Sequence, residues 1–224
     1  MCIARVRRTI DNVHIAVNKA HFPVTVLGPG RRIGLWLQGC SIGCPGCVSR
    51  DTWAADAGHL MPVEALLGWC RDVGAKGLDG VTISGGEPFD QPGALETLLR
   101  GLADWRSASG MDFDVLCYSG HPLRRLRSTH GRILALLDAL IPEPYVEAMA
   151  TEKSWRGSDN QPLVLLSARA RERYRDEAVQ QALQVRVDGR HIWYIGIPRR
   201  GDMDRLESKC RERGLEMKHV SWRA

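Results

Sequence analysis

Three cysteines within eight residues are the feature that most constrains this chain. The stretch 39–47 reads Gly-Cys-Ser-Ile-Gly-Cys-Pro-Gly-Cys, which places Cys40, Cys44 and Cys47 at the spacing C-x3-C-x2-C. Thiolates select zinc, copper(I) or iron–sulfur clusters, and this loop is short enough for all three sulfurs to converge. Three ligands are one fewer than a closed zinc site or a four-cysteine cubane requires. The spacing therefore predicts a metal centre with an open position.

A structural zinc site remains an alternative, because His59 or Cys70 can supply a fourth ligand. A second motif weighs against zinc. Residues 81–88 read Val-Thr-Ile-Ser-Gly-Gly-Glu-Pro, a short apolar strand that runs into a glycine turn with one carboxylate. Carbonyl groups at Gly85 and Gly86, together with the Glu87 carboxylate, offer hydrogen-bond acceptors at this turn.

Strands alternate with helices through the first two thirds of the chain. Apolar strands are predicted at 33–38, 81–84 and 113–118, and apolar residues recur with helical spacing at Val63, Leu66, Leu67 and Cys70, at Leu95, Leu98, Leu99 and Leu102, and at Ile133, Leu136, Leu137 and Leu140. This alternation predicts an α/β fold of parallel βα units. Because the units are too few for a closed eight-fold barrel, we expect an open, partial (βα) barrel with its site at the strand carboxyl ends.

The last part of the chain has a different pattern. We expect an irregular segment at 142–162, a charged helical stretch at 167–183, a hairpin of strands 184–188 and 192–197, a helix at 203–213 that stops at Gly214, and a final strand. This pattern predicts a small α+β appendage packed on the core. The predicted domains are therefore a core at 1–165 and an appendage at 166–224.

The composition of the chain indicates its redox compartment and which classes of partner to expect. Among seven cysteines, the outer four are scattered, at Cys2, Cys70, Cys117 and Cys210, which does not resemble a disulfide framework and indicates a reducing cytoplasm. We interpret the last three of these as core residues. The chain has no signal peptide pattern and no run that would span a membrane. A net charge of +5 is weak evidence for nucleic-acid binding, which we do not expect.

Together, the cysteine loop and the glycine turn resemble the radical S-adenosylmethionine (SAM) superfamily. The resemblance covers about residues 24–165 and is closest to glycyl-radical-enzyme activases of the anaerobic ribonucleotide reductase type. The matching stretches are Gly28-Pro29-Gly30 with Arg32, Cys44 to Cys47 followed by Thr52-Trp53, Tyr118-Ser119-Gly120, Pro144 to Glu147, and Arg156 to Gln161. Departures from the family pattern occur at Leu27, Ser49, Pro142 and Glu143.

The resemblance implies a [4Fe-4S] cluster held by Cys40, Cys44 and Cys47, with SAM on the fourth iron. It implies reductive cleavage of SAM to a 5′-deoxyadenosyl radical, which an activase uses to generate a glycyl radical on a partner enzyme. A flavodoxin- or ferredoxin-type protein would donate the electron. The alternative is a radical SAM enzyme that directly modifies a peptide, nucleotide or other small substrate. The residues implied in SAM binding are Gly85, Gly86, Glu87, Pro88, Tyr118 and Ser119.

No catalytic side chain is assigned from the sequence. Tyr118 or Trp53 can offer an aromatic face to the adenine of SAM. His121 follows the strand end at Tyr118-Ser119-Gly120 and can therefore touch SAM or substrate, although its position at the start of a helix favours a surface residue.

Overall fold

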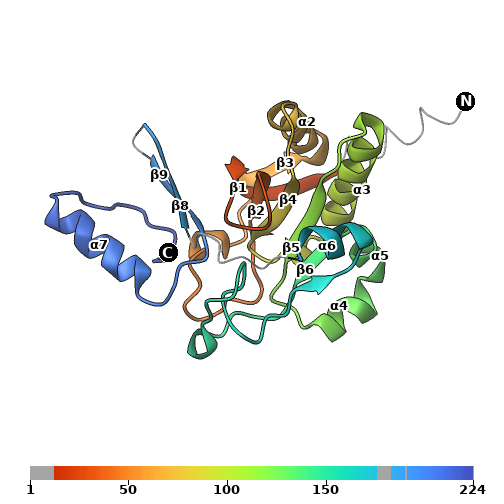
Figure 1. Cartoon of the computed structure of the whole chain (residues 1–224). Helices are drawn as coiled ribbons and strands as arrows, with labels where there is room; N and C mark the ends of the chain where they lie inside the picture. Colours follow the sequence, from red (N-terminus) through yellow and green to blue (C-terminus); the bar gives the residue numbers. More distant parts are fainter. Residues whose placement is uncertain (1–12, 176–182, 190, 224) are drawn as a thin grey trace, which may run out of the picture.

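The computed structural model describes residues 13–175, 183–189 and 191–223. Its centre is a seven-stranded sheet in the order β3-β1-β2-β4-β5-β6-β7 (Figure 1). The strands are β1 (His14–Val24), β2 (Arg32–Leu37), β3 (Leu60–Pro62), β4 (Gly80–Gly85), β5 (Asp114–Tyr118), β6 (Ala139–Ile141) and β7 (Val164–Leu165).

Four neighbouring strands, β2, β4, β5 and β6, run parallel, and the antiparallel strands β1, β3 and β7 flank them. The parallel strands follow one another in space in their order along the chain. Their carboxyl ends therefore meet at one edge of the sheet. The loops that leave this edge carry the cysteines and the glycine turn.

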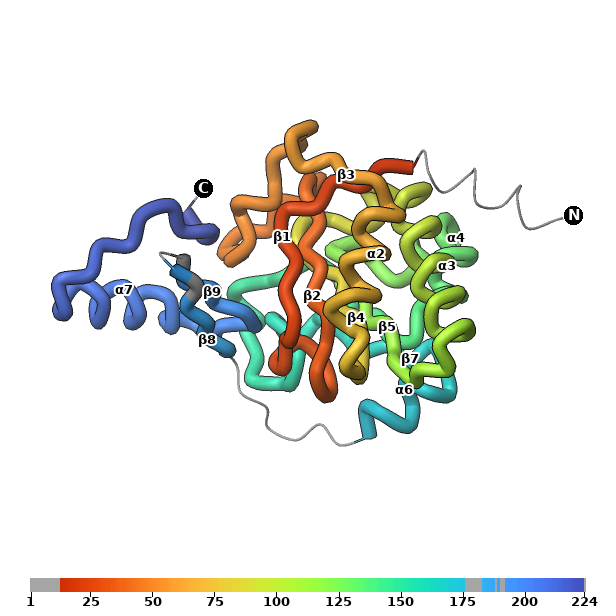
Figure 2. Tube along the Cα trace, turned by 90° about the horizontal axis from the view of Figure 1, so that it is seen from above, coloured from red at the N-terminus to blue at the C-terminus, as the bar shows by residue number. Residues whose placement is uncertain are grey.

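Helices α2 (Val63–Gly74) and α3 (Pro92–Ser109) lie side by side over one face of the sheet (Figure 2). Alternate residues of β2 divide between the two faces, as a strand buried on both sides requires. Ile33, Leu35 and Leu37 join the core beneath these helices. Trp36 points to the other face.

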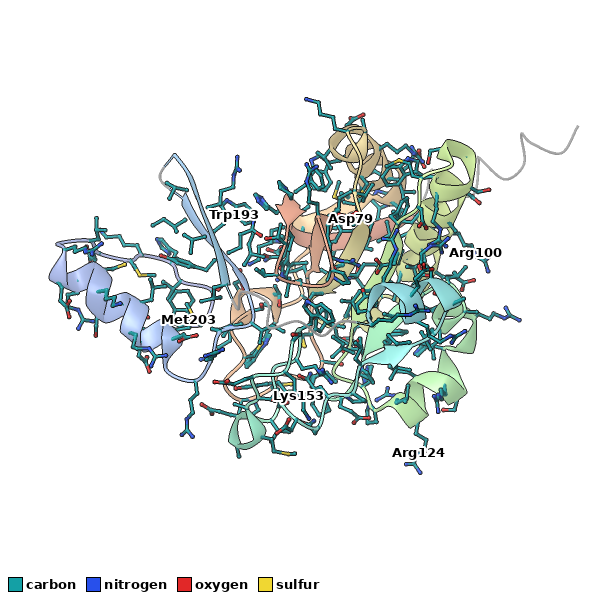
Figure 3. The ribbon with its side chains drawn as sticks, in the orientation of Figure 1. Asp79, Arg100, Arg124, Lys153, Trp193 and Met203 are labelled. Carbon is teal, nitrogen blue, oxygen red and sulfur yellow. The ribbon has the colours of Figure 1, made fainter. Side chains whose placement is uncertain are left out.

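That second face is covered by later parts of the chain. Trp155 and Tyr174 pack against Leu116 of β5, next to α6 (Ala168–Arg173). Ile195 packs against Trp36, and it belongs to the hairpin of β8 (Leu183–Asp188) and β9 (His191–Gly196). Trp193 of the same hairpin, labelled in Figure 3, stacks on His21 of β1 with ring centroids 5.2 Å apart.

The predicted helix across Ile133 to Leu140 is wrong. Helix α4 (Leu123–Thr129) is followed by the short α5 (Gly131–Leu134), and Leu140 lies in strand β6. Asp138 explains the break, because its carboxylate accepts hydrogen bonds from Val115 N at 2.9 Å and from the Ser167 hydroxyl at 2.7 Å. These contacts hold the chain beside β5, where the apolar residues that follow are buried as a strand.

The C-terminal part contains the predicted hairpin and the helix α7 (Asp202–Glu212). The predicted final strand is wrong for the described residues 213–223, which form turns and extended chain without strand pairing. The predicted strand pattern around Ile3 and Val6, and the end of the predicted helix beyond residue 175, lie outside the described residues. Among described helices, none is both long and apolar enough to cross a membrane.

The cysteines outside the loop divide by position. Cys70 and Cys117 are fully buried in the core, as predicted. Cys210 is only half-buried on α7, so its interpretation as a core residue is wrong. Cys2 lies outside the described residues. The six described cysteines are all free thiols.

Candidate functional site

The cysteine loop begins where β2 ends and returns to its own starting point. The amide of Gly39 donates to the carbonyl of Thr52 at 2.7 Å, and the amide of Cys40 donates to the carbonyl of Trp53 at 3.0 Å. Gln38 adds a side-chain bond to the carbonyl of Ala54 at 2.7 Å. Backbone bonds therefore hold both ends of the loop at the carboxyl end of β2.

All three cysteine sulfurs of the loop are half-buried and lie near one another. Burial raises the pKa of the Cys40 and Cys44 thiols, and the nearby Cys47 adds to both shifts. Backbone N–H groups oppose the rise: Ile42 and Gly43 donate to Cys40, and Tyr145 donates to Cys44. The amide of Ser49 donates to the Cys47 sulfur at 3.4 Å. Backbone donors therefore favour the thiolate forms of Cys40 and Cys44.

These sulfurs do not surround a single ion. Among the described residues, no group of three or more His, Cys, Asp or Glu side chains is arranged to hold one metal ion. A zinc ion requires its ligands around one point. A cubane cluster accepts each thiolate on a different iron, so its ligands are spread more widely. Cys70, a candidate fourth ligand in the zinc alternative, is fully buried in the hydrophobic core. The three loop thiols alone fit a cluster that leaves one iron open.

The glycine turn after β4 packs directly on the cysteine loop. The amide of Glu87 donates to the Gly39 carbonyl at 2.8 Å, and the amide of Gly86 donates to the Leu37 carbonyl at 2.9 Å. A Cβ atom at Gly86 would lie 2.0 Å from the Gly39 oxygen, and one at Gly85, where φ is +100°, would lie 2.4 Å from Leu37 N. Only glycine fits both places, because backbone meets backbone there.

The Glu87 carboxylate is 1% exposed and joins the ends of β4 and β5. Its Oε1 accepts from the Ser119 hydroxyl and from Phe89 N, both at 2.9 Å, and its Oε2 accepts from Gly120 N at 2.7 Å. Burial raises the pKa of Glu87 to about 7, although these hydrogen bonds oppose the rise. Ser119 and Glu87, both predicted as SAM contacts, are therefore in contact with each other.

Tyr118 and Pro88 have separate surroundings. The Tyr118 hydroxyl donates to the Trp155 carbonyl at 2.8 Å, which ties the end of β5 to the irregular segment 142–163. Burial raises the pKa of this phenol. Pro88 is buried and begins a single 3-10 turn, Pro88–Asp90. The six predicted SAM-binding residues thus lie at the ends of β4 and β5, beside the cysteine loop.

Sequence analysis missed Asp90. Its carboxylate accepts from Ser41 N at 2.7 Å and from the Ser41 hydroxyl at 2.8 Å, so it holds the residue next to Cys40. The sequence signal was a second carboxylate within the same turn as Glu87. His121 Nε2 lies 3.8 Å from Asp90 and the ring is buried, so its prediction as a surface residue is wrong. Burial, aided by the charge of Arg125, lowers the pKa of His121.

The fold and the site define a class: an α/β protein that presents three thiols on one loop at the carboxyl edge of a parallel sheet. Residues 26–164 match the family model described as a 4Fe-4S single cluster domain. This match spans more than half of the chain, so the chain belongs to that family.

Curated relatives make the assignment narrower. The anaerobic ribonucleoside-triphosphate reductase-activating protein of Enterobacteria phage T4 is 30% identical over 62% of this chain and 86% of its own length. The protein of the same name from Vibrio cholerae is 30% identical over 63% of this chain and 92% of its own length. The one from Escherichia coli K12 is 27% identical over 63% and 93%.

A solved structure, QueE from Escherichia coli, aligns with a TM-score of 0.41 at 20% identity, over 50% of this chain and 55% of its own. The family assignment rests on the sequence matches. By these matches the chain is a radical SAM enzyme of the activase type, and its cofactors are a [4Fe-4S] cluster and S-adenosylmethionine.

Proposed function

We propose that this protein generates a glycyl radical on a partner enzyme that resembles anaerobic ribonucleotide reductase. The observation that carries the proposal is the contact between the cysteine loop and the glycine turn, where Glu87 N donates to the Gly39 carbonyl at 2.8 Å. It places three thiols beside a turn suited to an amine ligand. The names of the relatives supply the class of partner.

Cys40, Cys44 and Cys47 would hold the cluster, and the turn at Gly85 and Gly86 would receive the amino group of SAM. When bound, these cofactors supply one-electron reductive cleavage of SAM to methionine and a 5′-deoxyadenosyl radical. The chain itself positions the site: Asp90 holds Ser41, and Glu87 holds Ser119 and Gly120. The Glu87 carboxylate already accepts three hydrogen bonds from the protein. We therefore assign it a positioning role in addition to any contact with SAM.

The partner would approach over residues 145–161 of the irregular segment and the mouth of the partial barrel. This segment lies at the carboxyl edge, where Tyr145 N donates to Cys44 and the Tyr118 hydroxyl reaches Trp155. Gln161 and Asn160 pin the segment to the Glu143 and Pro144 carbonyls at 2.9 and 2.8 Å. We further propose that the sheet is an open, partial barrel whose free side admits a loop of the partner. Met149, which is 44% exposed, lies on this segment and offers an apolar contact.

The remaining parts of the proposal concern the electron donor and the division of the chain into domains. A flavodoxin- or ferredoxin-type protein would supply the electron in a reducing cytoplasm, which agrees with six free thiols among the described cysteines. A division into a core at 1–165 and an appendage at 166–224 agrees with the end of the family match at residue 164.

The test is anaerobic reconstitution of the full chain with iron and sulfide, followed by addition of reductant and SAM. We expect 5′-deoxyadenosine and methionine to form, and a glycyl radical signal in electron paramagnetic resonance when a candidate reductase is present. Arg156 lies in the same irregular segment, and its guanidinium is suited to peptide carbonyls or a carboxylate of the partner. Arg156→Ala is therefore expected to keep uncoupled SAM cleavage while activation of the partner fails. Modification of a free metabolite without any protein partner would overturn the activase proposal.

A further inference from the structure

We propose that residues 213–223 form a C-terminal latch that fixes the hydrogen bond between Ser49 N–H and the Cys47 sulfur, with Ser221 as the positioning residue. The inference rests on the proposed role of Cys47 as a cluster ligand. It gives the C-terminal part of the chain a task in the site, although 173 residues separate Ser221 from Val48.

Ser221 contacts the cysteine loop on both sides of Ser49. Its hydroxyl donates to the Val48 carbonyl at 2.9 Å, and its carbonyl accepts from Asp51 N at 3.1 Å. Between these two contacts, Ser49 N donates to the Cys47 sulfur at 3.4 Å. The Val48 carbonyl belongs to the same planar peptide unit as Ser49 N–H. Because Ser221 holds this carbonyl, it also holds the direction of the Ser49 amide.

Ser221 is itself fixed by α7. The indole Nε1 of Trp222 donates to Glu207 on α7 at 2.8 Å, and Arg223 pairs with the same carboxylate. The ring of Trp222 also meets Tyr194 of β9 edge-on, with centroids 6.4 Å apart. The latch therefore connects to the hairpin as well as to α7.

The hairpin is anchored on the core at a different place. Ile195 is 2% exposed and packs on Trp36 of β2. The Gln184 amide donates to the Pro23 carbonyl at 2.8 Å and accepts from Thr25 N at 2.9 Å. These contacts give the latch a fixed base that does not involve the cysteine loop.

The segment under the latch also holds the first cysteine. The carbonyl groups of Thr52 and Trp53 accept hydrogen bonds from the amides of Gly39 and Cys40, and Asp51 pairs with Lys19 at 2.5 Å.

The hydrogen bond to Cys47 bears on the reduction potential of a bound cluster. An N–H dipole that points at a cluster thiolate stabilises the electron-rich state, and hydrogen bonds to sulfur are among the factors that set cluster potential. The latch therefore raises the reduction potential of the bound cluster.

The latch lies outside the part of the chain that its relatives share. The family match ends at residue 164, and the relatives above match 62–63% of this chain. The loop it contacts includes Ser49, one of the positions where this chain departs from the activase pattern. The inference thus concerns a support that this chain adds to the shared site.

The first experiment uses the cluster-free full chain and hydrogen–deuterium exchange of peptides that cover residues 48–53. Ser221→Ala removes the bond to Val48, and we expect exchange there to become up to about tenfold faster, the factor that corresponds to loss of one hydrogen bond. Ser128→Ala is the matched control, because it removes a serine hydroxyl that donates to the Arg125 carbonyl at 2.9 Å on α4, which is not part of the latch or its base. Ser221→Thr keeps the hydroxyl and should restore protection.

The second experiment measures the reduction potential of the reconstituted cluster. Ser221→Ala and Trp222→Phe should each make the potential more negative, while Ser128→Ala should match wild type. An unchanged or more positive potential in Ser221→Ala, or unchanged exchange at 48–53, would overturn the latch. A wild-type chain that takes up no cluster would overturn the proposed function instead, and the exchange result would then decide the latch alone.

Discussion

The strands β2, β4 and β5 have polar groups at both ends, but the two ends are built differently. At the amino-terminal end of these strands, called the starting end below, Arg32 and Asp114 form a fully buried ion pair, with Nη2 and Oδ2 2.7 Å apart. At the carboxyl-terminal end, called the finishing end below, the polar groups are half-buried thiols, backbone amides and the glycine turn.

The starting end is a closed network. The Arg32 guanidinium also donates to the Thr82 hydroxyl at 2.7 Å and to the Val81 carbonyl at 3.0 Å, while Tyr174 donates to Asp114 at 2.7 Å. Every strand start is thereby joined to a neighbour, and Tyr174 brings in the segment after α6. A buried charge must be paired and hydrogen-bonded in this way to be tolerated.

The finishing end joins the same strands through the Glu87 carboxylate and backbone amides in place of a fully buried ion pair. Glu87, Asp90 and backbone bonds hold the loops there, and the cysteine sulfurs remain accessible. The contrast shows a division of labour along one set of strands: the closed end supports stability, and the open end keeps donors available for cofactors. Four predictions test this contrast.

The largest effect is expected at the open end. Changing Cys40, Cys44 or Cys47 to Ala should abolish cluster binding, because each supplies one thiolate of the proposed set. Cys70→Ala and Cys117→Ala should keep the cluster, since both thiols are buried in the core. Iron content and visible absorbance after anaerobic reconstitution measure this, and equal loss of iron in Cys70→Ala would contradict the assignment.

The next effect is expected at the closed end. Arg32→Met should lower the free energy of unfolding by about 3–5 kcal/mol, because it leaves Asp114 buried without its partner. Arg71→Met is the control, since the Arg71–Glu64 pair is about 40% exposed on both sides and should cost at most about 1 kcal/mol. Chemical denaturation of the cluster-free chain decides, and equal losses in the two variants would remove the special role of the closed end.

Glu87 allows a pH test of the open end. Its pKa is about 7 in the folded chain and near 4.5 when unfolded, so the folded state binds more protons between these values. Stability should therefore fall as pH rises from about 4.5 to 7, by up to about 3 kcal/mol from this group. Glu87→Gln should lack this slope in denaturation curves measured across the range. A wild-type slope in the variant would assign the dependence to other groups.

The smallest effect is expected at Asp90. Asp90→Asn keeps one acceptor for Ser41 and loses the other, which should cost about 1 kcal/mol of local stability and speed amide exchange at residues 40–43. Asp104→Asn on the exposed side of α3 serves as the control. Identical exchange in the two variants would show that Asp90 does not support the loop.

The sequence was sufficient for features that depend on near neighbours. The helix faces of α2 and α3, the buried strands β2, β4 and β5, the hairpin β8–β9 and the stop of α7 at Gly214 all follow from patterns within a few residues. The cysteine loop and the glycine turn were recognised for the same reason, since their spacing is itself local. A local pattern failed at 133–140, where Leu140 fits a helix by period but lies in β6.

Only the tertiary structure decided which distant groups meet. The pairing of Glu87 with Ser119 and Gly120, of Arg32 with Asp114 and Tyr174, and of Ser221 with the cysteine loop spans 32 to 173 residues. The order of strands in the sheet creates the first two contacts, and the packing of the β8–β9 hairpin on β2 brings the third together. No spacing in the sequence encodes either arrangement. For this reason the sequence determined the cofactor chemistry of this chain, whereas the fold decided which residues position it.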